Sequence, residues 1–163
     1  MSDDRCYHSA LRILSHRFNS ELELRRKLGR KFEKPDIDAA VERLRRERWI
    51  DDERFAVAFA RARVNRRIGS RRIVRELQSA GVSRDSATQA VAENLNEDRE
   101  REAVRSLCEK KVKALTRRHG EGYVGTEEGR NKLAVYLLNQ GYDAALVYEA
   151  LKEIRVVHHQ PDP

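Results

Sequence analysis

Apolar residues recur along the chain every three or four positions, which is the spacing that places them on one face of an α-helix. The pattern returns three times with the same internal layout: an apolar pair, a turn, and a further apolar residue. The pairs are Leu24/Leu28, Ile73/Leu77 and Leu133/Leu137, and the residues after the turns are Phe32, Val82 and Tyr142. Counting five and nine residues onward reaches Ile37/Val41, Ala87/Val91 and Val147/Leu151, all apolar.

This recurrence predicts a unit of three helices, present three times in degenerate form. Two of the predicted turns have nearly the same sequence, with Gly81 and Gly141 at equivalent places. We expect both glycines to adopt the left-handed conformation that ends a helix. The first copy is one residue shorter and has Lys31 where the glycine would stand, so its turn must differ. Ser20, three residues before Glu23, is expected to cap the second helix of the first copy.

The predicted fold is all-α: an elongated, curved array of three tandem three-helix repeats. A unit of about fifty residues buries little surface by itself and is stabilised by its neighbours. The expected repeats are residues 5–48, 49–96 and 97–155, with a flexible glycine-containing loop at 116–128 and a frayed tail at 156–163. Trp49 and Ile50 are expected to form the apolar seam between the first two repeats, with Trp49 in the core rather than in contact with a ligand.

Composition supports small helical units with a wide polar surface, since 39% of the 163 residues are hydrophobic and 37% are charged. The net charge of +7 favours anionic partners.

Cys6 and Cys108 are too few for a disulfide framework and lack a metal-ligand spacing, so we expect two reduced thiols. No apolar run reaches the length of about 18 residues that a membrane span needs. With no charged and apolar leader at the N-terminus, we expect a cytoplasmic protein with no membrane partner.

Positive charge is concentrated in two windows. Residues 61–75 contain seven arginines and no acidic residue, and residues 110–119 contain five basic residues and no acidic one. The first window, here called the arginine segment, joins two predicted helices through Gly69 and Ser70, a helix stop followed by an N-cap. Its guanidinium groups should gather on one corner that suits a polyanion or an acidic protein surface. The candidate contact residues are Arg66, Arg67, Arg71, Arg72 and Arg75, followed by Arg61 and Arg63, then Lys110, Lys111, Lys113, Arg117 and Arg118, and last Arg25 and Arg26.

Each patch also has a simpler interpretation as a solvated helix face, which is the usual fate of a run of charges. For the arginine segment the lack of acidic residues counts against this, since solubilising helices normally mix signs at neighbouring positions. Cations in the second window would also complement the dipole at the end of a long helix. The third patch is diluted by Glu21, Glu23 and Glu33.

The sequence predicts no catalytic, cofactor-binding or metal-ligating residue. Asp51 and Asp52 are adjacent at a predicted helix start, where capping explains them more simply than a catalytic pair. His158 and His159 fall in the tail without a second shell of residues to hold a metal ion. No glycine-rich phosphate loop is present, so ATP hydrolysis would have to come from a partner.

Two stretches resemble the signatures of the RecX family. The run Trp49–Ala56, followed by Gly69, Arg72, Ile73, Glu76, Leu77, Gly81 and Val82, is similar to that family's central signature. Lys132, Leu133, Tyr136, Leu137, Gly141 and Tyr142 are similar to its third-repeat signature. The resemblance extends over nearly the whole chain. It implies a small all-helical protein of tandem three-helix repeats that binds the RecA recombinase and modulates its nucleoprotein filament, usually as an inhibitor.

On this resemblance we expect a monomer that binds the RecA filament, in its groove, and inhibits filament extension, ATPase and strand exchange. We also expect weak, sequence-independent binding to single- and double-stranded DNA, and no cofactor. The main alternative is a stand-alone DNA-binding protein of helix-turn-helix type. Against it, the predicted third helix of the last repeat carries Asp143, Glu149 and Glu153, which would repel phosphate. An enzyme and an unrelated helical scaffold are the remaining alternatives.

Overall fold

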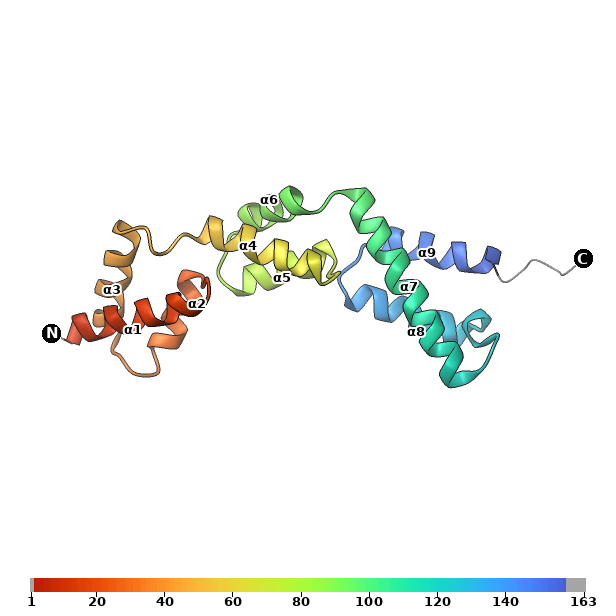
Figure 1. Ribbon diagram of the computed structural model, residues 1–163, viewed down its shortest axis with the longest axis horizontal. Coiled ribbons are helices and arrows are strands. Elements are labelled where there is room, and N and C mark those ends of the chain that lie inside the picture. Colours follow the sequence, from red (N-terminus) through yellow and green to blue (C-terminus); the bar gives the residue numbers. More distant parts are fainter. Residues whose placement is uncertain (1, 158–163) are drawn as a thin grey trace, which may run out of the picture. The chain divides into compact units, whose positions relative to one another are not determined.

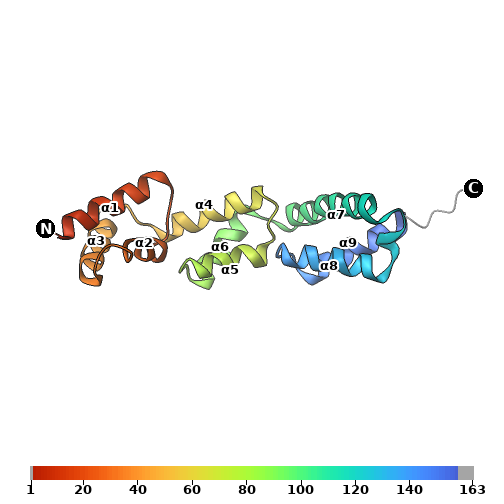
Figure 2. The ribbon, with the colours of Figure 1, turned by 90° about the horizontal axis from the view of Figure 1, so that it is seen from below.

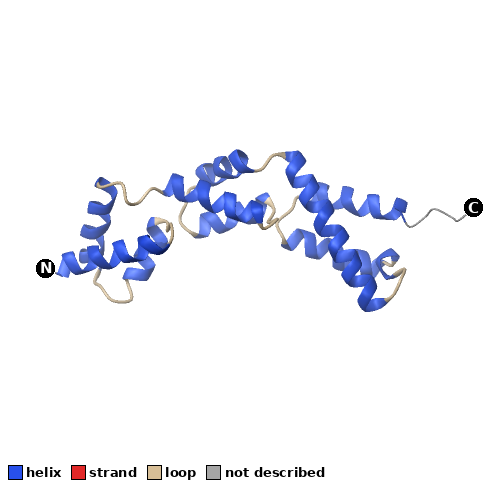
Figure 3. Cartoon of the chain, in the orientation of Figure 1, coloured by secondary structure: helices blue, strands red, loops and turns tan. Residues whose placement is uncertain are grey.

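The computed structural model describes the backbone of residues 2–157 and the side chains of residues 4–154. This part of the chain contains nine α-helices, one short 3₁₀ helix and no strand (Figure 1, Figure 3). In order they are α1 (Ser2–His16), α2 (Glu21–Leu28), α3 (Lys34–Arg46), α4 (Asp52–Asn65), α5 (Ser70–Ser79), α6 (Arg84–Asn94), α7 (Glu97–His119), η1 (Tyr123–Gly125), α8 (Glu127–Asn139) and α9 (Ala144–Val157). The predicted all-α class is confirmed. Of the predicted tail, residues 156 and 157 end α9, whereas His158 and His159 lie outside the described residues.

The described chain divides into two compact units. The first contains residues up to 62 together with 74–93, and the second contains residues 63–73 together with those from 94 onward. In the first unit α1, α2 and α3 pack on one another, and in the second α7, α8 and α9 do the same (Figure 1, Figure 2). The helices thus follow the predicted order, and the division into three repeats at residues 49 and 97 stays a prediction.

The core of α1, α2 and α3 is built from the positions that the spacing predicted. Leu24, Leu28 and Val41 are at most 1% exposed, and Ile37 is also buried. Ser20 caps α2 as expected, because its side-chain oxygen accepts a hydrogen bond from the backbone N–H of Glu23 at 3.1 Å. Burying such apolar side chains contributes about 1.5–3 kcal/mol each, so this face is what holds the three helices together.

Trp49 is not a core residue, which corrects the prediction. Its side chain is 57% exposed, whereas the neighbouring Ile50 is 8% exposed and belongs to the core. The cause is the way α3 ends. Arg48 takes a left-handed conformation with a φ of 59°, and the N–H of Trp49 donates to the carbonyl of Leu44 at 2.9 Å. This closing turn directs Ile50 inward and leaves the indole outside.

The predicted loop at 116–128 is shorter than expected and partly packed. Helix α7 continues to His119 and α8 begins at Glu127, so only residues 120–126 are outside the two α-helices. Within that stretch Val124 is 4% exposed and joins the core of α7, α8 and α9. Gly129 lies so close to the turn that an added Cβ would stand 2.1 Å from the carbonyl oxygen of Tyr123. The middle of the loop therefore packs against α8 and contributes to the core.

Cys108 lies in this same core, and its environment predicts slow chemistry. Both cysteines are buried and neither forms a disulfide, and burial raises the pKa of the Cys108 thiol from 9.0 to about 11. At pH 8 the native thiol should alkylate about a hundredfold more slowly than in the unfolded chain, because the thiolate is the reacting species. The raised pKa also stabilises the fold below pH 9, an advantage lost as the pH rises towards 11. Mass spectrometry of the Cys108 peptide after a short iodoacetamide pulse, with and without denaturant, measures the alkylation rate in the native and unfolded chain. Equal rates would contradict the prediction of slow native alkylation.

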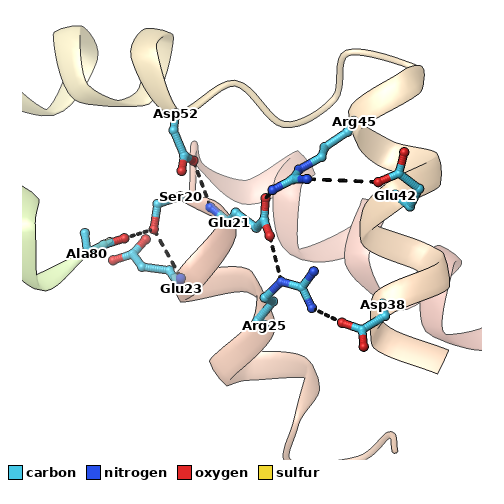
Figure 4. A network of polar contacts seen from close by, with 9 residues as sticks. All are labelled: Ser20, Glu21, Glu23, Arg25, Asp38, Glu42, Arg45, Asp52 and Ala80. Atoms are coloured by element: carbon cyan, nitrogen blue, oxygen red, sulfur yellow. Dashed lines mark hydrogen bonds and ion pairs between the residues drawn. The ribbon is translucent and has the colours of Figure 1, made fainter. Parts of the chain in front are cut away.

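The first of two equivalent seams joins α2 to the segments around Asp52 and Ala80, inside the first unit (Figure 4). The fully buried hydroxyl of Ser20 donates to the carbonyl of Ala80 at 2.5 Å. The backbone N–H of Glu21 donates to the carboxylate of Asp52 at 2.9 Å. Gly81 follows with a φ of 90°, and a Cβ there would lie 2.7 Å from the Cβ of Leu22. This polar junction, rather than Trp49, is the seam of that region.

The second seam repeats this arrangement inside the second unit. The N–H of Gly69 donates to the carbonyl of Gln140 at 2.9 Å, and the N–H of Ser70 donates to the carboxylate of Glu100 at 2.8 Å. Gly141 has a φ of 94°, and a Cβ on it would lie 2.2 Å from the Cβ of Arg72. The predicted left-handed conformation of both turn glycines is thus confirmed. In each seam, the start of a short helix (α2 in the first, α5 in the second) donates one hydrogen bond to a carbonyl of a later turn. It donates another to an acidic side chain.

Candidate interaction surface

The arginine segment begins in the last turns of α4 and continues into α5, and the end of α4 differs from the prediction. The left-handed residue is Arg67, with a φ of 56°, and the N–H of Ile68 closes the turn on the carbonyl of Arg63 at 3.1 Å. Gly69 does not supply the helix stop. A side chain there would lie 2.4 Å from the carbonyl carbon of Gly141, so Gly69 is needed for close approach of two backbones.

Part of the arginine segment serves the second seam instead of a free surface. Arg71 forms an ion pair with Asp143. The guanidinium of Arg72 donates to the carbonyl of Asn139 at 3.4 Å. The hydroxyl of the buried Tyr142 donates to the carbonyl of Arg67 at 2.7 Å, and burial raises the pKa of that hydroxyl. These contacts hold the segment in place but offset some of its charge.

The seven arginines do not all belong to one unit. Arg63, Arg66, Arg67, Arg71 and Arg72 lie in the second unit, and Arg61 and Arg75 lie in the first. Arg61 and Arg63 both have interaction partners of their own. Within the described chain, the exposed side chains of Arg66, Arg67 and Arg75 form no ion pair. These three are the members of the segment best placed to meet an external anion.

The second window forms a row of cations on α7. Lys110, Lys113 and Arg117, here called the cationic row, recur at helical spacing, are all exposed, and form no ion pair among the described residues. The row covers about 10 Å along the helix axis. Arg118 is exposed next to it, and the ammonium group of Lys111 lies 4.7 Å from the centre of the Tyr136 ring.

The first half of α7 contrasts with this row, since two of its three arginines form ion pairs. Arg105 contacts Glu153 at 3.3 Å and Arg101 contacts Asp98 at 3.6 Å. The second half of the same helix therefore presents positive charge that no ion pair among the described residues compensates. The cationic row extends beyond the last turn, where the helix dipole favours cations, so the dipole alone does not explain it.

The third patch is largely engaged in holding the fold. Arg25 contacts Glu21 at 2.7 Å and Asp38 at 2.5 Å (Figure 4). Burial acts to raise the pKa of Glu21, but hydrogen bonds from Arg25 and Arg45 outweigh it, and the pKa is lowered. Arg26 donates to the carbonyl of Ser79 at 3.3 Å, beside the first seam. The contacts of Arg25 and Arg26 inside the fold thus account for both residues without an external partner.

The acidic pair at the start of α4 also has a structural explanation. Asp51 accepts a hydrogen bond from the N–H of Arg54 at 2.9 Å, and Asp52 accepts one from the N–H of Glu21. Asp51 caps α4 as predicted, whereas Asp52 serves the start of α2 and not the helix that it begins. Among the described residues no group of three or more His, Cys, Asp or Glu side chains is placed to hold a metal ion. No helix in the same residues is long and apolar enough to span a membrane.

The fold and these surfaces define a helical-repeat protein with exposed, uncompensated cations on helix faces. Comparison with known proteins narrows this class. Residues 6–44 match the model of the first three-helix domain of RecX, and residues 51–91 match that of the second. The chain is 27% identical over 154 residues to the regulatory protein RecX of Clostridium beijerinckii, covering 94% of this chain and 70% of that one. It is 32% identical over 149 residues to the regulatory protein RecX of Salmonella heidelberg, covering 85% and 84%.

The chain belongs to the RecX family, which confirms the resemblance seen in its signatures. The fold agrees with the crystal structure of RecX from Lactobacillus salivarius, with a TM-score of 0.75 at 21% identity, covering 95% of this chain and 97% of that one. At this identity the likeness supports the fold alone. These relatives are named regulatory proteins.

Proposed function

We propose that this chain binds the RecA recombinase and its DNA filament, in the filament groove, and inhibits filament extension, ATPase and strand exchange. The observation that carries the proposal is the cationic row of α7, together with Arg66 and Arg67, on a member of the RecX family. DNA phosphate is the anion that such a row of side chains suits best. No bond is made or broken in this role, because occupancy alone hinders subunit addition and filament motion.

A chain of similar helical units can contact several subunits of a polymer at once. Linked weak contacts give strong overall binding without any single tight site, because the second contact forms at high effective concentration. This agrees with the modest number of cations that remain available to an external partner, since Arg71, Arg72 and Arg25 have partners inside the fold. DNA affinity by itself should therefore be weak and independent of sequence.

The test is the DNA-dependent ATPase of the host recombinase, titrated with this protein at low and moderate salt. The wild-type chain is expected to lower the rate, and replacing Lys110, Lys113 and Arg117 by glutamine should raise the concentration needed about tenfold or more. A matched control removes three charges from Arg101, Arg105 and Lys152, all of which have internal contacts. An ATPase rate that the wild-type chain leaves unchanged at excess would refute the proposal.

A second variant separates the arginine segment from the row. Arg66→Gln and Arg67→Asn remove two exposed charges, and asparagine tolerates the left-handed conformation of residue 67. Arg71 and Arg72 are left in place, because their replacement would disturb the second seam. Inhibition should weaken in this variant with an unchanged helical circular dichroism spectrum; full inhibition would remove Arg66 and Arg67 from the contact surface.

A further inference from the structure

Two large aromatic side chains of the first unit stand in solvent. Phe18, between α1 and α2, is 59% exposed, and Trp49, between α3 and α4, is 57% exposed. Both line one hollow of about 360 Å³, to which α1 contributes the apolar side chains of Leu11 and Leu14. A folded domain gains free energy by burying aromatic rings, so two of them exposed around one hollow mark an interaction site.

The hollow continues along α4 and α6. A second hollow of about 550 Å³ is lined by Val57 and Ala58 of α4 and by Ala90 of α6. Phe18 and Arg54 line both hollows, so the two meet beside the phenyl ring. We call the two together the aromatic groove. All of its lining residues belong to the first unit.

Both rings are presented by backbone that is held in place. Next to Phe18, the side chain of Asn19 is 3% exposed, donates to the carbonyl of Arg17 at 2.7 Å and accepts from Lys27 at 2.6 Å. Trp49 is held by the closing turn of α3 and by the buried Ile50 after it. The backbone beside each ring therefore has little freedom left to lose on binding, which lowers the cost of association.

The charges beside the groove decide what it binds. Three are positive and three are negative: Arg48, Arg54 and Arg61 against Asp51, Glu53 and Glu93. The carboxylates would repel the phosphates of a nucleic acid, whereas a protein helix can meet both signs. The small side chains of Ala58 and Ala90 allow a helix backbone to come close.

We infer that the aromatic groove binds an amphipathic helix of a protein partner, which inserts a large apolar side chain between Phe18 and Trp49. Charged residues of both signs flank that side chain and face the opposite charges beside the groove. Under the proposed function, on which this inference rests, the groove contacts the recombinase protein. The cationic row on the second unit then contacts DNA.

The test exploits the single tryptophan of the chain. Labelling with 5-fluorotryptophan places one fluorine at Trp49, and its resonance is followed by ¹⁹F NMR. Recombinase filament assembled on single-stranded DNA should shift or broaden this resonance. The same DNA alone and a rising concentration of the chain itself should leave it unchanged. A response to DNA alone would identify a base-stacking platform, and a response to concentration would identify a dimer; either outcome overturns the inference.

Variants separate this inference from the proposed function. Phe18→Ser and Trp49→Ser should weaken filament binding about tenfold or more without changing affinity for free DNA. Tyr148→Ser is the matched control, since this ring of α9 is 60% exposed and lies outside the groove. Thermal unfolding should be unchanged in all three. If the groove variants bind the filament normally, the inference fails alone; if the wild-type chain does not bind the filament, the proposed function fails with it.

Discussion

Replacing Gly141 by alanine should destabilise the protein by about 3 kcal/mol or more, the largest loss we expect from adding a single methyl group. Two effects act together. The residue has a φ of 94°, which a side chain resists, and the new Cβ would stand 2.2 Å from the Cβ and 2.6 Å from the backbone nitrogen of Arg72. Neither neighbour is the flexible end of a side chain, so α5 and the turn after α8 must separate. Equilibrium denaturation by urea measures the free energy of unfolding.

Gly120 provides the control for backbone strain alone. It has a nearly identical φ of 92°, but no atom lies within 4 Å of a Cβ added there. Gly120→Ala should therefore lose only about 1 kcal/mol. Gly81→Ala should fall between the two, because its nearest neighbour, the Cβ of Leu22, is farther away at 2.7 Å and the other atoms that it meets lie farther out on the same side chain. Equal losses for Gly141→Ala and Gly120→Ala would show that the second seam is looser than described.

Raising the salt concentration from about 50 to 200 mM should weaken DNA binding about a thousandfold, if about six phosphates are contacted. The uncompensated cations Arg66, Arg67, Lys110, Lys113, Arg117 and Arg118 can supply contacts of this number. Replacing Lys110, Lys113 and Arg117 by glutamine should reduce the slope of log affinity against log salt by about three. Fluorescence anisotropy with labelled oligonucleotides of unrelated sequence gives both the slope and the sequence dependence.

Arg25→Gln is the informative comparison for the salt measurement. Its guanidinium contacts Glu21 and Asp38, so its removal should lower stability and leave the salt slope unchanged. A slope that is the same for the cationic-row variant and the wild type would exclude the row as the DNA contact. Sequence-selective affinity for duplex DNA at physiological salt would instead favour the helix-turn-helix alternative.

Several features could be predicted from local sequence alone. The apolar spacing located the helices and core positions such as Leu24, Leu133 and Val147, because a helix needs one continuous apolar face wherever it packs. The left-handed Gly81 and Gly141 followed from the turn itself, because few other residues adopt that conformation at low cost. The capping roles of Ser20 and Asp51 were equally local.

Other features could not be predicted, because they depend on residues distant in the sequence. Arg71 is paired because Asp143, 72 positions later, lies beside it, and Gly69 is required because Gly141 approaches its backbone. Trp49 is exposed because the closing turn of α3 gives the inward position to Ile50. Charge counting over a window cannot distinguish a paired arginine from a free one.

The sequence by itself determined the helical periodicity, the turn glycines and the family, since each depends on residues within a few turns of one another. Only the tertiary structure decided which cations remain uncompensated and which aromatic rings remain exposed. The physical reason is that pairing and burial are properties of neighbours in space, and the packing of the helices brings together residues that are far apart in the sequence.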